Sequence, residues 1–384
     1  MAMASRPPQF GMVAGEASGD LLASLLVGGM QARWPALGCF GIGGPKLAER
    51  GFDAWWPSDK LAVRGYVEVL RHYREITGIR KALKARLLAE PPDLFIGVDA
   101  PDFNLDLERD LKQQGIKTVH FVCPSVWAWR AERVHKIRQS TDHVLCIFPF
   151  EVDLLAQAGV AATFVGHPLA GVIPLEPDKA AARQSLGLLD SDLVLAVLPG
   201  SRKSEAQYLA SRFFEAAALV KHAQPAIKIV VPAIPALKPA ILEAVAGAGL
   251  AGQVQVLDGQ SHAALAACDV TLIASGTATL EAALFKRPMV IAYKISALSW
   301  PLMKRMAYLP WVGLPNILLQ DFVVPERLQH DANPAQLAAD VLAWLDQPAR
   351  MLSVHQRFLE LHHTLRRDTA RAASDAIAQV LESR

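Results

Sequence analysis

The stretch Leu94–Asn104, LFIGVDAPDFN, shows the pattern that recurs along the chain, an apolar run followed by a polar loop and a helix start. Its first half, Leu94–Val98, is a short apolar run of the kind that forms a buried strand. Asp99 follows directly, and an aspartate at the end of a buried strand loses hydration free energy unless it faces a solvent-filled cleft or has a partner. The stretch therefore predicts a buried strand, a polar loop that can form a site, and a helix.

Short apolar runs alternate with longer amphipathic stretches along the whole chain. The apolar runs include Phe10–Ala14, Leu94–Val98, Thr118–Val122, His143–Ile147 and Thr163–Val165 before Pro168, and Leu193–Leu198, Ile227–Val231, Val254–Leu257, Val270–Ala274 and Met289–Ala292 after it. The helical stretches include Asp20–Arg33, Lys179–Leu186, Ala206–His222 and Thr279–Phe285. Short strands that alternate with helices are typical of parallel sheets covered on both faces. Because crossovers between parallel strands are right-handed, the simplest α/β fold is an open, doubly wound sheet.

The segment Gly166–Asp178, GHPLAGVIPLEPD, interrupts this pattern with three prolines and two glycines. We interpret it as the linker between two Rossmann-like domains, residues 1–168 and residues 169–345. From about Pro334 the sequence is typical of helices only. The C-terminal helices of residues 346–384 could pack back across the linker onto the first lobe. Two such lobes are expected to face each other across a cleft between their strand ends.

The composition excludes several classes of protein. Hydrophobic residues make up 52% of the 384 residues and charged residues 20%, which rules out a disordered chain. The net charge is only +2, so no overall field draws the chain onto nucleic acid. The four cysteines are scattered without a C-x-x-C pair, which argues against a zinc site or a disulfide framework.

The amino terminus and the apolar runs bear on location. MAMASRPPQF has no signal-peptide or transit-peptide pattern. No apolar run approaches the roughly 18 to 20 residues that a spanning helix needs. We therefore expect a cytoplasmic protein.

The loop Gly15–Asp20, GEASGD, is a candidate binding loop of the first lobe. In doubly wound sheets, ligands bind beyond the carboxyl ends of the strands, where loops lead into helix amino termini. The glycines allow a ligand close to the backbone, and the helix start offers free N–H groups. The alternative is a tight turn in which Ser18 caps the helix and Asp20 interacts with the helix dipole. The loop lacks both the G-x-G-x-x-G of dinucleotide sites and the GK[ST] of a P-loop.

The loop that begins at Asp99 is the second candidate of this lobe. Asp99, Asp102 and Asn104 supply two carboxylates and an amide within a few residues, enough for a general base and an orienting partner. The alternative is an Asx turn followed by a capped helix.

Two loops of the second lobe predict a nucleoside diphosphate site. Gly200, Ser201 and Arg202 follow an apolar run, and arginine binds phosphate through a bidentate fork. The run Ser275–Thr279, SGTAT, likewise opens a helix, whose amino terminus suits a pyrophosphate. Glu281 could accept ribose hydroxyls, or it could be only a dipole-matched residue of the helix start. Because no D-x-D cluster accompanies these loops, we expect no metal.

Basic and aromatic residues gather in four further regions. Val67–Leu88 is a basic amphipathic segment, and Ser299–Pro315 carries Trp300, Lys304, Arg305 and Trp311. The pairs Trp55–Trp56 and Trp127–Trp129 add aromatic side chains. Such segments suit an anionic membrane surface, or they are solvated helices with a packed underside. A single-strand nucleic-acid surface is disfavoured by the low net charge.

Several motifs, in order along the chain, resemble those of the lipid-A-disaccharide synthases, a family of glycosyltransferases with the two-lobed GT-B fold. They are GEASGD, GVDAPDFN, CPSVWAWR, LPGSR, ASGTATLE and LPN, and they extend from Gly15 to Asn316. The resemblance implies a hexosyltransferase that joins UDP-2,3-diacylglucosamine to 2,3-diacylglucosamine 1-phosphate (lipid X). The products are UDP and the β-1,6-linked lipid A disaccharide 1-phosphate, with inversion at the anomeric carbon, in Gram-negative bacteria.

The resemblance also implies roles for individual residues. Asp99 matches the proposed general base of the family, and Arg202 matches its essential phosphate-loop arginine. Residues expected on the donor side are Gly200, Ser201, Arg202, Ser275, Gly276, Thr277, Thr279, Glu281 and Asn316. Residues expected on the acceptor side are Gly15, Glu16, Ser18, Gly19, Asp20, Asn104 and Ser125. No cofactor or metal is expected, and the lipid substrates imply peripheral association with the cytoplasmic face of the inner membrane. Whether the chain forms a homo-oligomer stays open.

Three alternatives remain at this point. A UDP-sugar 2-epimerase could use the same fold and nucleotide site without a lipid-facing surface. A non-catalytic nucleotide or lipid carrier would bind without turnover, although the polar Asp99 loop argues against it. A different lipid-linked transferase would share both the fold and the donor site.

Overall fold

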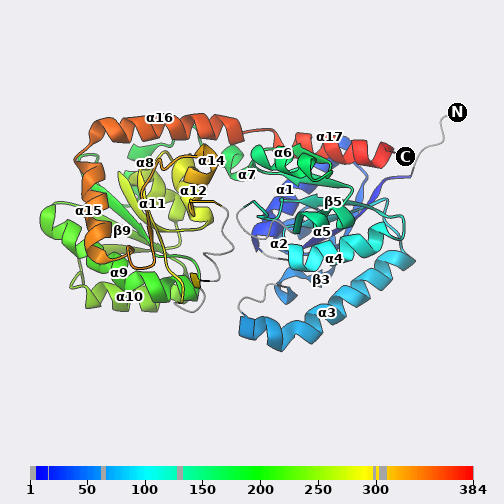
Figure 1. Cartoon of the computed structure of the whole chain (residues 1–384), viewed down its shortest axis with the longest axis horizontal. Coiled ribbons are helices and arrows are strands. Elements are labelled where there is room, and N and C mark those ends of the chain that lie inside the picture. Colours follow the sequence, from blue (N-terminus) through cyan, green and yellow to red (C-terminus); the bar gives the residue numbers. More distant parts are fainter. Residues whose placement is uncertain are drawn as a thin grey trace. The chain divides into compact units, whose positions relative to one another are not determined.

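The computed structural model describes residues 6–15, 17–61, 66–127, 133–296, 300–301 and 309–383, without the side chains of residues 17 and 66–73. The chain divides into two compact units. Unit 1 comprises Met1–Gly171 and Leu365–Arg384, and unit 2 comprises Val172–Thr364 (Figure 1). The division between Gly171 and Val172 lies inside the segment Gly166–Asp178 that was interpreted as the linker. The predicted C-terminal segment 346–384 is shared, because its last helix belongs to unit 1 and the preceding one to unit 2.

Unit 1 contains a parallel seven-stranded sheet in the order β3-β2-β1-β4-β5-β6-β7. The strands are β1 (Gln9–Ala14), β2 (Gly38–Gly43), β3 (Asp53–Pro57), β4 (Leu94–Val98), β5 (Lys117–Phe121), β6 (His143–Cys146) and β7 (Ala162–Phe164). The helices are α1 (Ala17–Arg33), α2 (Pro45–Ala48), α3 (Tyr66–Ala89), α4 (Pro101–Lys112), α5 (Arg133–Ser140), α6 (Phe150–Gln157), α7 (Pro168–Val172, which ends at the first residue of unit 2) and α17 (Thr369–Glu382).

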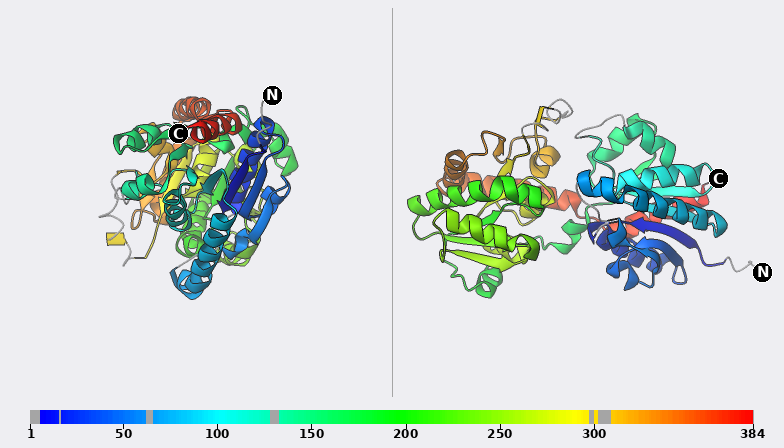
Figure 2. Two further views of the ribbon diagram at one scale, coloured as in Figure 1. Left: turned by 90° about the vertical axis from the view of Figure 1, so that its right-hand side faces the viewer. Right: turned by 90° about the horizontal axis from the view of Figure 1, so that it is seen from below.

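Unit 2 contains a parallel six-stranded sheet in the order β10-β9-β8-β11-β12-β13. The strands are β8 (Val194–Leu198), β9 (Lys228–Ala233), β10 (Val254–Asp258), β11 (Val270–Ala274), β12 (Met289–Tyr293) and β13 (Glu326–Leu328). The helices are α8 (Lys179–Ser185), α9 (Lys203–Ala223), α10 (Lys238–Gly247), α11 (Ser261–Ala267), α12 (Thr277–Leu284), α14 (Leu314–Leu319), α15 (Pro334–Leu345) and α16 (Pro348–Leu365, whose last residue belongs to unit 1). Helices cover both faces of each sheet (Figure 2), which confirms two doubly wound α/β units.

The sequence pattern missed three strands. β2, with the sequence GCFGIG, and β3, with DAWWP, lack a clear apolar run because glycines and exposed positions interrupt them. β13 has only three residues, all partly exposed. β3 and β13 lie at the sheet edges and are at most partly buried, so neither carries the continuous apolar run of a central strand.

The last helix, α17, packs against α1 within unit 1 (Figure 1). Arg33 of α1 forms an ion pair with Asp375 at 2.6 Å, and a Cβ on Gly29 would lie 2.6 Å from the Cβ of Ala370. Lys117 at the start of β5 donates to the carbonyl oxygen of Val380 at 2.7 Å. The close helix contact explains the glycine in the middle of α1, where a side chain would push α17 away.

The described part of α3 is an amphipathic helix with a packed underside. Leu83 and Leu87 are fully buried in the core with Phe95 of β4. On the other side, Arg80 pairs with Asp106 of α4 at 3.0 Å, and Lys84 pairs with Asp110 at 2.8 Å. Arg80 and Lys84 are thus held within unit 1, whereas Arg74 and Lys81 are exposed, so the membrane contact expected for this segment stays a prediction.

The tryptophans near this helix also have internal partners. Trp55 stacks on Phe40 at a centroid distance of 4.7 Å, and the guanidinium of Arg86 lies 3.7 Å from its ring centre. Trp129, Arg130 and residues 302–308, which contributed to the same prediction, lie outside the described residues. In the described part of the chain, no helix combines the length and hydrophobicity needed to cross a membrane.

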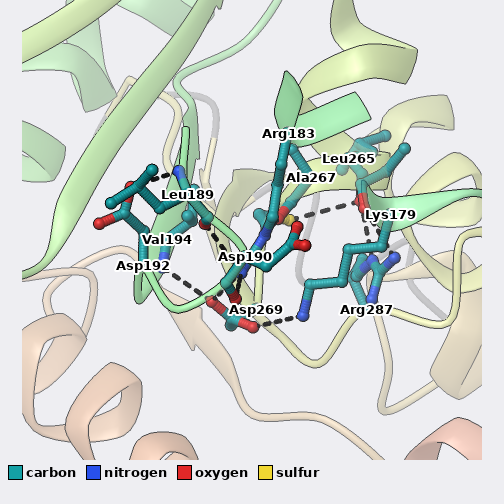
Figure 3. A network of polar contacts seen from close by, with 12 residues as sticks. Lys179, Arg183, Leu189, Asp190, Asp192, Val194, Leu265, Ala267, Asp269 and Arg287 are labelled. Carbon is teal, nitrogen blue, oxygen red and sulfur yellow. Dashed lines mark hydrogen bonds and ion pairs between the residues drawn. The ribbon is translucent and has the colours of Figure 1, made fainter. Parts of the chain in front are cut away.

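A polar network ties α8 to the amino ends of the unit 2 strands (Figure 3). Asp269, just before β11, accepts hydrogen bonds from Lys179 at 2.6 Å, from Arg183 at 2.9 Å and from the N–H of Val194 at 2.8 Å. Arg183 is 3% exposed and also donates to the carbonyl oxygens of Ala267 and Asp190. Because ligands bind at the opposite, carboxyl edge of such sheets, we interpret this network as structural.

Replacing Asp269 with asparagine should lower the free energy of unfolding of unit 2 by about 3 kcal/mol, because it leaves the buried guanidinium of Arg183 without its counter-charge. Chemical denaturation would measure the change. Asp258→Asn is the matched control, since Asp258 is 68% exposed in its ion pair with Lys238, and should cost at most about 1 kcal/mol. Equal effects of the two substitutions would contradict the structural role of the network.

Candidate active site

Three loops meet at the carboxyl edge of the unit 1 sheet. β4 lies between β1 and β5, with Ala14 paired to Val98 and Val98 paired to Phe121. The loops that follow these three residues are therefore neighbours. A Cβ on Gly15 would lie 3.7 Å from the Cβ of Ala100, so the Gly15 loop and the Asp99 loop are in contact distance. In the sheet, β2 and β3 lie beyond β1, whereas β5, β6 and β7 lie beyond β4. The strand order therefore reverses between β1 and β4, and doubly wound sheets bind ligands at the carboxyl ends of the strands at such a switch point.

The backbone of this edge is strained. Asp99, Ala100 and Val122 have φ values of +52°, +43° and +78°, in the left-handed region that residues other than glycine avoid. Each such residue costs on the order of 1–3 kcal/mol, and strained residues of this kind cluster at functional sites. Val122 is β-branched, which makes its conformation less favourable still. The concentration of strain supports this edge as a site, with the half-buried Asp99 at its centre.

Two hydrogen bonds hold the Asp99 backbone in this conformation. Its N–H donates to the carbonyl oxygen of Phe121 at 2.9 Å, which extends the pairing of β4 with β5. Its carbonyl oxygen accepts from Nδ2 of Asn104 at 2.8 Å. Asn104 lies in the first turn of α4 and is fully buried. The structure therefore places Asn104 behind the loop, where it holds the backbone of Asp99, and not in a sugar pocket as predicted.

Asp20 also has a different position from the predicted acceptor contact. Its side chain is 2% exposed, and its carboxylate accepts from the backbone N–H groups of Gly44 at 2.8 Å, Lys46 at 2.8 Å and Leu47 at 3.2 Å. These bonds cap the start of α2 and connect it to α1. Sequence reasoning had considered Asp20 only in relation to its own helix.

The other predicted acceptor residues lie at the same edge. Gly15 and Gly19 are buried, whereas Ser18, in the first turn of α1, is exposed. Ser125 is exposed in the loop that follows β5. Glu16 lies outside the described residues.

Glu151 of α6, which the sequence analysis missed, anchors the loop after β5. Nε1 of Trp127 donates to Oε1 of Glu151 at 3.1 Å, and the N–H of Phe148 donates to Oε2 at 3.1 Å. The Trp127 ring lies edge-on to Phe150 at a centroid distance of 5.3 Å. Glu151 is 1% exposed, and burial raises its pKa to about 8. The aromatic side chain of the tryptophan motif thus packs inward on α6.

A second missed group lies behind Asp99. Glu108 of α4 and His120 of β5 are both fully buried, and Oε1 of Glu108 lies 2.7 Å from Nδ1 of His120. Gly97 of β4, the register partner of His120, leaves room for them, since a Cβ there would lie 2.0 Å from Oε1 of Glu108 and 2.9 Å from the Cβ of Asn104. The signal in the sequence was a glutamate on the apolar face of one helix and a histidine inside an apolar strand.

In unit 2 a pocket of about 250 Å³ lies at the carboxyl edge of β8 and β11. These two strands are neighbours and form the switch point of this sheet. The pocket is lined by seven of the predicted donor residues, Gly200, Ser201, Arg202, Ser275, Gly276, Thr277 and Glu281. Pro232 of β9, Ile234 directly after β9 and Ser261 at the start of α11 add to its wall.

Glu205 closes the loop that carries Arg202. Its carboxylate accepts from the N–H groups of Ser201 at 3.0 Å and Arg202 at 3.2 Å, and it pairs with the Arg202 guanidinium at 2.9 Å. Gly200 has a φ of +116° and lies against Glu205, since a Cβ added to Gly200 would be 2.5 Å from the Cβ of Glu205. The Arg202 side chain is 65% exposed, so a ligand can reach its guanidinium beside Glu205. Glu205 was not predicted, although a carboxylate three residues into a helix is a capping-box signal.

Two predicted donor residues are not part of the lining. Thr279 is fully buried, and its hydroxyl donates to the carbonyl oxygen of Gly276 at 2.7 Å. Asn316 is also fully buried, and its amide donates to Val324 at 2.9 Å and to Glu326 at 2.8 Å. Both side chains hold neighbouring loops together.

The remaining polar groups of the pocket are tied to nearby elements. The Ser275 hydroxyl donates to the carbonyl oxygen of Val312 at 2.8 Å. Oε2 of Glu281 lies 3.2 Å from Nε2 of His262, and this hydrogen bond raises the pKa of His262. The ring of His262 also contacts Phe285 at 5.3 Å. Over the described ranges, no group of three or more His, Cys, Asp or Glu side chains is arranged to hold a metal ion.

Comparison with known proteins identifies close relatives. The family model described as lipid-A-disaccharide synthetase matches residues 11–380. Lipid-A-disaccharide synthase of Albidiferax ferrireducens is 63% identical, over 97% of both chains, and that of Burkholderia pseudomallei is 52% identical, over 100% of this chain and 99% of the other.

Solved structures share the fold at low identity. A UDP-GlcNAc 2-epimerase from Neisseria meningitidis, bound to UDP-GlcNAc, has a TM-score of 0.63 at 11% identity and covers 97% of this chain and 99% of its own. The glycotransferase of kitacinnamycin has a TM-score of 0.61 at 17% identity, with 98% and 99% covered. At such identities the likeness shows the fold alone, so it gives no separate support to the epimerase alternative.

Gly97→Ala should destabilise unit 1 by about 1–3 kcal/mol, the range for overpacking a filled core, because the new methyl group displaces the Glu108 carboxylate from His120. Thermal or chemical denaturation would measure it. Gly78→Ala is the control, since a Cβ at this exposed position of α3 meets no atom within 4 Å. It should stabilise by about 0.5–1 kcal/mol. A neutral Gly97→Ala would show that the space behind Asp99 is not filled as described.

Proposed function

The chain belongs to the lipid-A-disaccharide synthetase family, and we propose that Asp99 of unit 1 and the Arg202 pocket of unit 2 carry its reaction. It is a glycosyltransferase with the GT-B fold that forms the lipid A disaccharide. In this family, diacylglucosamine passes from UDP-2,3-diacylglucosamine to lipid X, and UDP is released. The roles of individual residues in activating the acceptor and in binding UDP belong to the proposal.

Asp99 serves as the general base. Its carboxylate takes the proton of the acceptor 6-hydroxyl while that oxygen attacks the anomeric carbon of the donor. The new C–O bond forms on the face opposite the departing UDP, so the configuration inverts. The observation that carries the assignment is the position of Asp99: it is the carboxylate at the strained switch-point edge of unit 1, held by Asn104 from behind.

The unit 2 pocket holds UDP. The α12 amino terminus at Gly276 and Thr277 offers N–H groups to the diphosphate, and Arg202 offers its guanidinium. Glu281 accepts ribose hydroxyls. Negative charge develops on the diphosphate as the glycosidic bond breaks, and these donors stabilise it. We therefore expect the transfer to proceed without a metal, and activity in excess chelator would test this.

Association with the cytoplasmic face of the inner membrane is part of the same proposal. It is supported by the acyl chains of the family's substrates and by the sequence of Ser299–Pro315, where Trp300, Lys304 and Arg305 combine aromatic and basic groups. The described half of α3 contributes little, because its apolar side chains lie in the core.

Asp99→Asn should lower the lipid-X-dependent release of UDP by at least about 10²-fold, the usual loss for a general base. Asparagine tolerates the left-handed conformation of this position, so the loop should keep its shape. Asp102→Asn is the matched control, since the side chain of Asp102 is 84% exposed and pairs with Arg133 at 2.8 Å. A nearly normal rate for Asp99→Asn would remove Asp99 from the mechanism.

Arg202→Ala should raise KM for the UDP-sugar by about 10- to 100-fold, the equivalent of one charge-assisted hydrogen bond, with a smaller effect on KM for lipid X. Arg202→Lys should restore only part of the affinity, because lysine cannot form the bidentate contact. The neighbouring exposed cation gives the control Lys203→Ala. Donor kinetics unchanged by Arg202→Ala would disprove the phosphate contact.

A further inference from the structure

The Glu108–His120 pair occupies the space directly behind the Asp99 loop. Glu108 comes from α4, the helix that begins at Asp99's own loop, and His120 from β5, the strand that pairs with β4. Their 2.7 Å contact is possible only because Gly97 has no side chain. Gly97 does not have a positive φ, so space and not backbone conformation requires the glycine. Three adjacent elements are thus shaped around this pair.

Stability alone does not account for the pair. Both groups are fully buried. Desolvating two ionisable groups costs several kcal/mol for each ion, and well-packed apolar residues of the same volume are often neutral or more stabilising. A buried ionisable pair beside a strained loop therefore points to a role in the site.

Unpaired polar atoms are concentrated in the same place. Among the described residues, five buried side-chain atoms have no hydrogen-bond partner, and three of them belong to Asn104, Glu108 and His120. They are Oδ1 of Asn104, Oε2 of Glu108 and Nε2 of His120. Buried polar atoms are nearly always paired, so exceptions in one cluster call for an explanation. Asn104 also holds the Asp99 carbonyl, which links the cluster to the loop.

The charges favour an imidazolium at His120. Burial opposes a charged ring, but the charge and hydrogen bond of Glu108 outweigh it and raise the pKa of His120, and Asp99 acts in the same direction. Burial raises the pKa of Glu108, which the histidine opposes. A buried imidazolium paired with a carboxylate carries no net charge, which offsets part of the cost of burying each ion. Because such coupling is reciprocal, an imidazolium that Asp99 stabilises must in turn favour the ionised form of Asp99.

Other charged groups around β5 have their own partners. They are Asp102 with Arg133 at 2.8 Å, Lys112 with Asp142 at 3.0 Å, Lys117 with the carbonyl oxygens at the end of α17, His143 with Thr163 at 2.9 Å, and Glu151 with Trp127 at 3.1 Å. Among the described residues, Glu108 and Asp99 are the charged groups that act on His120.

We propose that Glu108 and His120 are positioning residues for the reaction: Glu108 holds His120 as an imidazolium, and this buried positive charge keeps the Asp99 carboxylate ionised and ready to accept the acceptor's proton. The inference rests on the proposed role of Asp99 as general base. It adds a group that touches neither substrate and acts through Asp99.

The first test is the pH profile of kcat/KM for lipid X. In Glu108→Gln the hydrogen bond to Nδ1 can persist while the negative charge is lost, so His120 becomes neutral. The acid limb of the profile should then move up by about one pH unit, the low end of the effect of a nearby opposite charge. The rate at low pH should fall about tenfold, with little change on the alkaline side. A purely structural role would lower the rate equally at every pH. Asp110→Asn removes another carboxylate of α4, one that pairs with Lys84 at 2.8 Å, and should leave the position of the limb unchanged.

The second test reads the charge of His120 directly, by nitrogen NMR of the full chain labelled at histidine and assigned with His120→Gln. The ring should carry both protons at neutral pH in the wild type. In Asp99→Asn its titration should move to lower pH, a measurement that needs no activity and no Glu108 variant. A neutral His120 in the wild type, or an unmoved acid limb in folded Glu108→Gln, would overturn the inference.

The two proposals can fail separately. If Asp99→Asn keeps its rate, the base assignment fails, whatever the state of His120. If Asp99→Asn is inactive but Glu108→Gln keeps the wild-type profile, the base assignment stands and only the positioning role is lost.

Discussion

The parallel pairing of β4 between β1 and β5 is the constraint on which the unit 1 site depends. It brings the ends of three strands to one edge, and the chain must leave that edge at once to begin α4. Asp99 and Ala100 absorb this change of direction in left-handed conformations that neither residue prefers. The strain persists because the Phe121 carbonyl and the Asn104 amide hold both sides of the Asp99 backbone. In unit 2, β8 and β11 form the equivalent edge, where Gly200 makes the corresponding turn.

Both candidate sites combine exposed polar residues with buried polar residues that support the loops. In unit 2, Arg202 is exposed while Glu205 holds its loop, and Thr279 and Asn316 hold the segments next to the pocket. In unit 1, Asp99 is half-buried while Asn104 and the Glu108–His120 pair lie behind it. A buried polar side chain must find partners inside the protein, and at these edges the nearest partners are the backbone groups of the loops. Residues within one motif can therefore have unlike roles.

Sequence reasoning located the loops better than the individual side chains. The run LFIGV followed by Asp99, and LVLAVL followed by Gly200, marked two strands and two sites, and the structure has loops at the carboxyl ends of strands there. Asp20, Asn104, Thr279 and Asn316 stand in the right loops or beside them but face inward. Their direction depends on which backbone groups lie nearby, and those belong to segments distant in the chain. Asp20, for example, binds Gly44, which no local pattern indicates.

The alternation of short apolar runs with helices determined, from the sequence alone, that two doubly wound sheets form, because burial of strands on both faces requires that pattern. The motifs determined the family, since their residue types and order extend from Gly15 to Asn316. Only the tertiary structure decided that Glu108 meets His120 behind Asp99, that α17 belongs to unit 1, and that Arg80 and Lys84 of α3 pair with α4. Each of these contacts joins residues whose spacing along the chain carries no periodic signal. The contacts form only when separate elements pack against one another.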